Sequence, residues 1–134
     1  MRDLLGAIAV LLALAGCGED PEILLPATAD PVLVHATAGR GEAAAEATEL
    51  PDAAAVREYA AQFDEILALK VQRAARGIEV GANEVLAAQV VAIGCDVPSA
   101  AAYRDGAFVP TDVAPPRPEC FAPVTTVALA AVPA

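Results

Sequence analysis

The stretch Val124-Thr125-Thr126-Val127-Ala128-Leu129 carries the strongest strand signal in the chain. It is rich in β-branched residues, which favour extended backbone, and the apolar run continues as far as Val132. Pro123 stands directly before it, a position at which a strand tolerates proline. These features predict a strand that begins after Pro123 and ends at Val132.

Two other segments have the composition of strands. Residues 32–34 form a short apolar run, consistent with a first strand. Residues 85–97 are apolar at both alternating sets of positions, as in a central buried strand. A helix beginning at Asn83 is the alternative for this segment, because residues 86–89 include good helix formers. Gly94 and the β-branched residues of the segment favour the strand.

The clearest helix signal begins at Asp52, a good N-cap residue, and Pro51 stops any helix upstream of it. Gly77 is a suitable C-terminal stop. Between these ends, apolar residues recur every three or four positions and so share one helix face: they are Val56, Tyr59, Phe63, Ile66, Leu67 and Val71. We expect one amphipathic helix that packs this stripe on the sheet. A groove for a partner is the alternative role of the stripe.

The connections carry loop and turn signals. Residues 39–49 form a low-complexity loop that is rich in Ala and Glu and has no apolar stripe. Asp105-Gly106 predicts a hairpin turn, and the prolines of residues 115–118 predict a stiff loop that bars a helix. Together these signals predict an α+β fold, with one amphipathic helix packed on a small antiparallel sheet.

The first seventeen residues have the pattern of an export signal. Arg2 precedes an apolar run at residues 4–15, which is shorter than the roughly 20 residues that a membrane-spanning helix needs. The run ends in Leu14-Ala15-Gly16-Cys17, which resembles the lipobox of bacterial lipoproteins at all four positions. The resemblance implies cleavage between Gly16 and Cys17 and attachment of acyl chains, such as palmitate, to Cys17.

This resemblance divides the chain into three parts. Residues 1–16 would be a lipoprotein signal peptide, and residues 17–31, which are acidic and contain prolines, would be a tether. Residues 32–134 would form a single small domain. The acyl chains on Cys17 make the lipid bilayer a partner, because two or more chains give stable anchoring. The expected location is the cell membrane or the outer membrane, facing the periplasm or the cell exterior.

Cys95 and Cys120 are then left as a pair in an exported chain, where disulfides are expected. Cys95 closes the first long predicted strand and Cys120 opens the last one. If those strands are antiparallel neighbours, their ends meet and a disulfide fits. The alternative is a redox or metal pair. The two cysteines lack Cys-x-x-Cys spacing, however, and the sequence has no second histidine beside His35 to complete a zinc site.

The acidic composition narrows the choice of partners. Eighteen Asp and Glu residues oppose eight Lys and Arg residues, for a formal net charge of −10. Nucleic acid is not an expected partner, because phosphate binding needs basic patches. The charge fits either the solubility of a surface-exposed protein or a cationic partner.

The sequence lacks the residue combinations of common catalytic sites. His35 is the only histidine and Ser99 the only serine, and Ser99 has no Gly-x-Ser-x-Gly setting. Asp96, Asp105 and Asp112 do not have the spacing of a calcium loop. We therefore expect no catalytic residue, no metal site and no cofactor.

Two classes of function remain. Residues 94–98 together with residues 119–127 look like those of uncharacterised lipoproteins of high-GC bacteria, which implies no particular activity. The order of predicted elements in the C-terminal part is also loosely similar to the PrcB-type protease-complex inhibitor domain. The main expectation is a non-catalytic envelope module that binds a protein or a ligand. The alternative is an envelope protease inhibitor or regulator.

Overall fold

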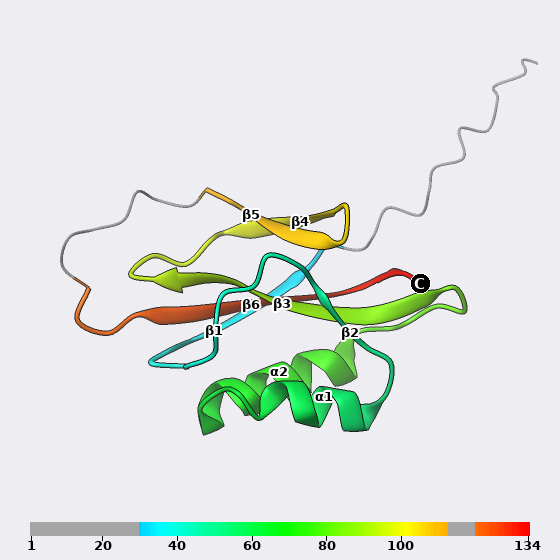
Figure 1. Ribbon diagram of the computed structural model, residues 1–134, viewed down its shortest axis with the longest axis horizontal. Coiled ribbons are helices and arrows are strands. Elements are labelled where there is room, and N and C mark those ends of the chain that lie inside the picture. Colours follow the sequence, from blue (N-terminus) through cyan, green and yellow to red (C-terminus); the bar gives the residue numbers. More distant parts are fainter. Residues whose placement is uncertain (1–29, 113–119) are drawn as a thin grey trace, which may run out of the picture.

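A computed structural model of the protein describes residues 30–112 and 120–134. These residues form strands and helices of an α+β fold, which confirms the expected class (Figure 1). In chain order the elements are β1 (Val32–Thr37), β2 (Thr48–Leu50), α1 (Ala53–Ala60), α2 (Glu65–Gly77), β3 (Glu84–Gly94), β4 (Ala100–Arg104), β5 (Ala107–Thr111) and β6 (Val124–Pro133).

Four strands form an antiparallel sheet in the order β1-β6-β3-β2. β6, predicted from its β-branched run, lies inside the sheet and pairs with both β1 and β3. β3 confirms the strand interpretation of residues 85–97, although it ends at Gly94. Gly94 lies opposite Val124 and Glu84 lies opposite Pro133, so the two longest strands are paired at both ends, with one register shift at Val91 between them. The first predicted strand is also confirmed and continues to Thr37.

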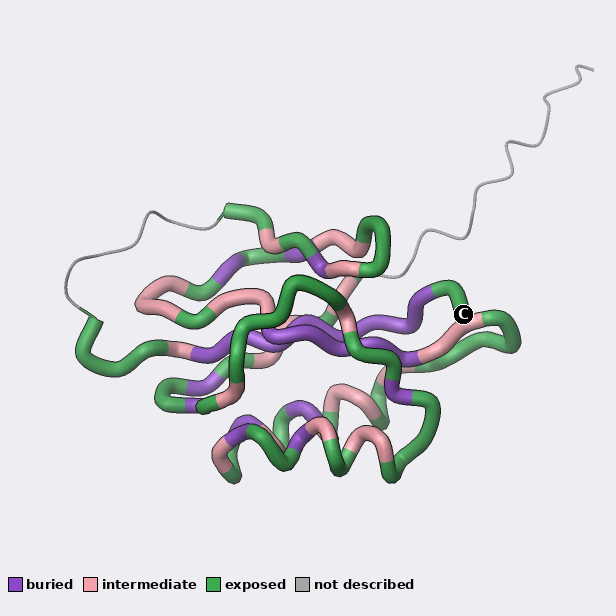
Figure 2. The backbone as a smooth tube through the Cα atoms, viewed as in Figure 1, coloured by how far each residue is buried: buried purple, intermediate pink, exposed green. Residues whose placement is uncertain are grey.

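This sheet is the middle of three layers (Figure 1): α1 and α2 cover one face, and the β4–β5 hairpin covers the other. β6 alternates between the two cores. Val127 and Leu129 belong to the helix-side core, whereas Ala128 and Ala130 belong to the hairpin-side core. Figure 2 shows buried residues running along the two central strands, β3 and β6. Because both faces are covered, β6 is apolar at nearly every position.

The hairpin that forms the third layer turns at Asp105-Gly106, as predicted. Phe108 is 2% exposed and packs in the hairpin-side core, with its ring centroid 5.1 Å from that of Tyr103. Gln89 of β3 accepts a hydrogen bond from the Phe108 backbone N–H at 2.7 Å, and its Nε2 donates to the Ala44 carbonyl at 2.8 Å. One buried amide therefore ties both the hairpin and the loop before β2 to the central sheet.

The prediction of a single helix from Asp52 to Gly77 is wrong, because residues 61–64 separate α1 from α2. Asp64 is the N-cap of the second helix, and its Oδ1 accepts from the Leu67 N–H at 2.9 Å. The Asp64 N–H donates to the Gly39 carbonyl, also at 2.9 Å. In a sequence, a new N-cap aspartate looks the same as an aspartate on the solvated face of one long helix.

The break changes the phase of the apolar stripe. Leu67 and Val71 are fully buried, but Ile66, which was predicted to face the core, is 60% exposed. With 3.6 residues per turn, a helix oriented by Leu67 and Val71 turns the residue before Leu67 away from the sheet. The other predicted stripe residues are buried or pack against the core as expected: Val56, Tyr59 and Phe63.

The loop that precedes β2 crosses the edge of the sheet from the helix side to the hairpin side. Arg40 forms a β-bridge with Phe63 beside the helices. Further along, the Ala47 N–H donates to the Gly106 carbonyl at 2.9 Å. The loop character predicted for residues 39–49 is therefore confirmed, except that residues 48–50 form the short strand β2.

Two adjacent threonines of β6 point to opposite faces of the sheet and differ in their hydrogen bonding. The Thr125 hydroxyl donates to the Arg40 carbonyl at 2.8 Å, on the helix side. The Thr126 hydroxyl is buried and has no hydrogen-bond partner among the described residues. The pair therefore offers a direct comparison between a satisfied and an unsatisfied hydroxyl.

We expect Thr126→Val to leave the free energy of unfolding unchanged or to raise it by about 1 kcal/mol, because a methyl group replaces an unsatisfied buried hydroxyl. Thr125→Val should lower it by about 1 kcal/mol, because the bond to the loop is lost. Urea unfolding of both variants measures the difference. A clear loss in Thr126→Val would show that the hydroxyl is satisfied, for example by an internal water.

Candidate functional site

A groove of about 410 Å³ lies between the two helices and the β2 side of the sheet. Leu50 of β2 and Leu86 of β3 face each other in the sheet register and line the groove from the sheet side. Val56 of α1 and Ala75 of α2 line it from the helix side, and Val80 lies after α2. The lining is therefore mainly aliphatic.

The chain forms this groove because β2 is short and α1 starts immediately after it. Leu50, the last residue of β2, is 3% exposed and anchors the strand in the core. Pro51 follows, and the Asp52 side chain then caps α1 by accepting from the Ala55 N–H at 2.7 Å. The first turn of α1 is thus held next to the end of β2, and α2 returns along it to complete the groove.

Polar side chains at the groove include two arginines, Arg57 and Arg76, together with Asp52 and Gln72. Arg57 lies in the last turn of α1 and Arg76 in the last turn of α2, where a positive charge complements the helix dipole. Neither guanidinium forms an ion pair with any residue of the described ranges. The groove thus combines an aliphatic lining with two positive charges that no described residue pairs, in a chain whose net charge is −10.

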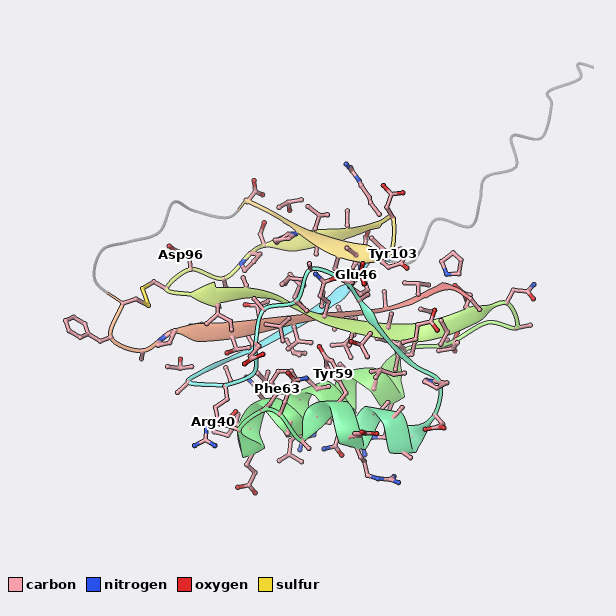
Figure 3. All side chains as sticks on the ribbon, in the orientation of Figure 1. Arg40, Glu46, Tyr59, Phe63, Asp96 and Tyr103 are labelled. Atoms are coloured by element: carbon pink, nitrogen blue, oxygen red, sulfur yellow. A yellow bond between two sulfur atoms is a disulfide. The ribbon has the colours of Figure 1, made fainter. Side chains whose placement is uncertain are left out.

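The surroundings of Tyr59 shift its pKa away from the value of a free phenol. Burial raises the pKa of Tyr59 to about 12, and a backbone hydrogen bond with Val90 offsets part of that effect. Its ring packs edge-on against Phe63, with the ring centroids 5.5 Å apart. Figure 3 shows both rings between the helices and the sheet. At neutral pH the phenol is uncharged, so it can pack and form hydrogen bonds but does not act as a base.

The raised pKa of Tyr59 predicts a loss of stability in alkali. The unfolded chain releases this proton near pH 10, whereas the folded protein holds it until about pH 12. The stabilising contribution is complete below pH 10 and is lost as the pH rises through 12. In Tyr59→Phe, the free energy of unfolding should therefore fall less steeply across this window, by up to about 1.4 kcal/mol per pH unit. Urea unfolding at several pH values tests this, and a slope equal to that of wild type would contradict it.

Cys95 and Cys120 form the predicted disulfide, with an S–S distance of 2.06 Å and a Cα–Cα distance of 5.4 Å. Cys95 directly follows β3, and Cys120 precedes β6. The two strands are antiparallel neighbours, as the prediction required. The predicted lipidation and cleavage residues, Cys17 and Gly16, lie outside the described residues, as does the predicted proline-rich loop at residues 115–118.

The residues considered for catalysis do not form a catalytic arrangement within the described ranges. The Ser99 hydroxyl donates to Asp112 Oδ2 at 3.0 Å. His35 is exposed on β1, where its carbonyl accepts from Lys70 Nζ at 2.8 Å. Residues 30–112 and 120–134 contain no group of three or more His, Cys, Asp or Glu side chains that could hold a metal ion. No helix in that part of the chain is long and apolar enough to span a membrane.

The groove was not predicted from the sequence, because its residues come from separate segments. Val56 is the only member of the predicted apolar stripe that lines it. Arg57 and Arg76 were not distinguishable from ordinary solvated helix residues, since nothing local shows that both face one groove. The sequence offered one related hypothesis, namely that the apolar stripe forms a groove for a partner.

Comparison with known proteins finds no match: no family model, no curated protein and no solved structure is significantly similar to this chain.

Proposed function

We propose that this protein is an exported, lipid-anchored lipoprotein of the bacterial cell envelope, whose folded domain is a non-catalytic binding module. The observation that carries the proposal is the sequence Leu14-Ala15-Gly16-Cys17 at the end of an apolar run. In bacterial lipoproteins this pattern marks the site of cleavage and lipid attachment. Cys17 would carry the acyl chains and hold the protein on the cell membrane or the outer membrane.

The disulfide supports an extracytoplasmic location. Bonds such as Cys95–Cys120 form and persist in oxidising compartments and are rare in the cytosol. An acidic chain gains little attraction from anionic lipid headgroups, so the acyl chains would supply the membrane affinity. The domain would then face the periplasm or the cell exterior.

The groove supports a binding role for the domain. Its volume of about 410 Å³ lies within the usual range of ligand sites, and its lining combines aliphatic side chains with a few polar groups. Ser99 and His35, the candidates for nucleophile and base, lie outside this lining. A bound molecule would therefore be held without being transformed.

We expect Cys17→Ala to abolish labelling of the protein by a clickable palmitate analogue, because no thiol remains at the lipidation position. A double variant, Cys95→Ala with Cys120→Ala, is the matched control and should keep the label. Mass spectrometry of the mature wild-type protein should find an acylated peptide that begins at residue 17. Retention of Met1 in the mature wild-type chain would overturn the proposal.

An envelope protease inhibitor is the second candidate, and one observation favours it. Phe121 is 96% exposed and directly follows the bridged Cys120. A large apolar side chain held next to a disulfide is preorganised to enter a pocket of a partner. Crosslinking in intact envelopes tests this: capture of a protease by wild type but not by Phe121→Ala supports inhibition, and capture of none argues against it.

A further inference from the structure

We propose that the groove between the helices and the β2 side of the sheet binds a small amphipathic anion, an unbranched aliphatic carboxylate. Its alkyl chain would lie against Leu50 and Leu86, and its carboxylate would be held at the polar rim by Arg57 and Arg76. This inference rests on the proposed binding function and specifies the chemical class of the ligand.

The aliphatic part of the groove matches an alkyl chain. Among the described residues, its apolar lining consists of Leu, Val and Ala side chains and contains no aromatic ring. Val80 keeps 46% of its surface exposed, and Val56 and Ala75 are only partly buried, so apolar surface remains for a ligand to cover. Covering such surface is favourable in proportion to its area.

The charges at the groove select an anion. Arg57 and Arg76 have no ion-pair partner in the described part of the chain. Asp52 is the only carboxylate among the described residues of the lining, and it already caps α1 by accepting a hydrogen bond from the Ala55 N–H. Two positive charges therefore face one negative charge, the reverse of the overall balance of this acidic chain. A guanidinium matches a carboxylate in both charge and geometry.

The surroundings favour a small ligand over a peptide strand. An extended peptide is usually held by backbone hydrogen bonds along a free strand edge. β2, the only edge strand at the groove, has three residues. Away from their end turns, the adjoining helices use their backbone groups in their own hydrogen bonds. A ligand with one apolar chain and one negatively charged end can contact both the aliphatic lining and the two arginines.

The test is a calorimetric titration of the full-length chain in lipid nanodiscs, with empty nanodiscs as the reference for partition into the bilayer. The probes are hexanoate, heptanoate and octanoate, with octan-1-ol and octylammonium as ligands of similar length but different charge. We expect octanoate to bind more tightly than either of these. Affinity should rise by about fourfold per added methylene.

Arg57→Gln and Arg76→Gln should each weaken octanoate binding by about fivefold at low salt, and should leave octan-1-ol unaffected. Arg73→Gln is the matched control, because Arg73 is exposed on the same helix as Arg76 but does not line the groove. Val80→Asp, at a half-exposed position that tolerates a polar side chain, should weaken octanoate binding by placing a negative charge at the groove.

Equal binding of octanoate and octylammonium, or octanoate binding that neither arginine variant weakens, would overturn the proposal. Absence of octanoate binding to a chain that carries lipid on Cys17 would also overturn it, while leaving the lipoprotein assignment in place. Conversely, a missing lipid on Cys17 would overturn that assignment without changing the result for the groove.

Discussion

Replacing Phe63 by alanine is expected to lower the free energy of unfolding by about 3–5 kcal/mol. The side chain is 7% exposed and lies in the helix-side core with Leu67 and Val71. It occupies the short connection between α1 and α2 and packs edge-on against Tyr59. Truncation would leave a cavity between α1, α2 and the loop before β2, and these elements cannot all move to fill it. Urea unfolding of the variant and the wild type measures the loss.

Phe63 also fixes the loop before β2, which adds to the expected loss. Its backbone bridges Arg40, and its ring lies directly against Gly41. A Cβ at residue 41 would stand 2.5 Å from Phe63 Cε1, and Gly41 has a φ of +79°, which disfavours other residues. Without the ring, the loop loses the surface on which it rests.

Ile66→Ala is the matched control for this prediction. Ile66 lies three residues further on, belongs to the same predicted stripe and is 60% exposed. Its truncation should change the free energy of unfolding by less than about 1 kcal/mol, as expected for a surface position. A loss below about 1 kcal/mol for Phe63→Ala would contradict the packing of this side chain in the core.

The strands that could be predicted are those whose composition alone restricts the backbone. β6 is β-branched at its start and stays apolar to Val132, and β3 is apolar at both alternating sets of positions. Both features arise because two layers cover the sheet. The Asp105-Gly106 turn was predictable because its residues tolerate positive φ, at +51° and +81° respectively.

The features that could not be predicted depend on contacts between distant segments. Asp64 begins a new helix partly because its N–H donates a hydrogen bond to the Gly39 carbonyl. The spacing of apolar residues in the sequence gives no sign of that contact. The exposure of Ile66 follows from the same break. The hairpin is held on the face opposite the helices in part by Gln89, whose side-chain oxygen accepts a hydrogen bond from the Phe108 N–H. The groove likewise requires Arg57 of α1 and Arg76 of α2 to face the same space from two separate helices.

Loss of the Cys95–Cys120 disulfide is expected to lower the free energy of unfolding by about 2–5 kcal/mol. Cys95 directly follows Gly94, which is paired with Val124 in the sheet, and Cys120 lies four residues before Val124. The cysteine Cα atoms are 5.4 Å apart. The bond closes a loop with a sequence separation of 25 residues. In the chain-entropy account, a loop of that length contributes roughly 3.5 kcal/mol by restricting the unfolded chain.

The double variant Cys95→Ala with Cys120→Ala measures this effect in urea, and reduced wild type gives an independent value. The two should agree, because the pairing of β3 with β6, which runs from Glu84 to Gly94 with one irregularity at Val91, does not require the bond. Oxidised wild type should migrate faster than reduced protein on a non-reducing gel, and neither thiol should react with an alkylating reagent. Two freely alkylated thiols in the native protein would contradict the bridge. That result would also remove the disulfide as support for an extracytoplasmic location and return Cys95 and Cys120 to consideration as a redox or metal pair.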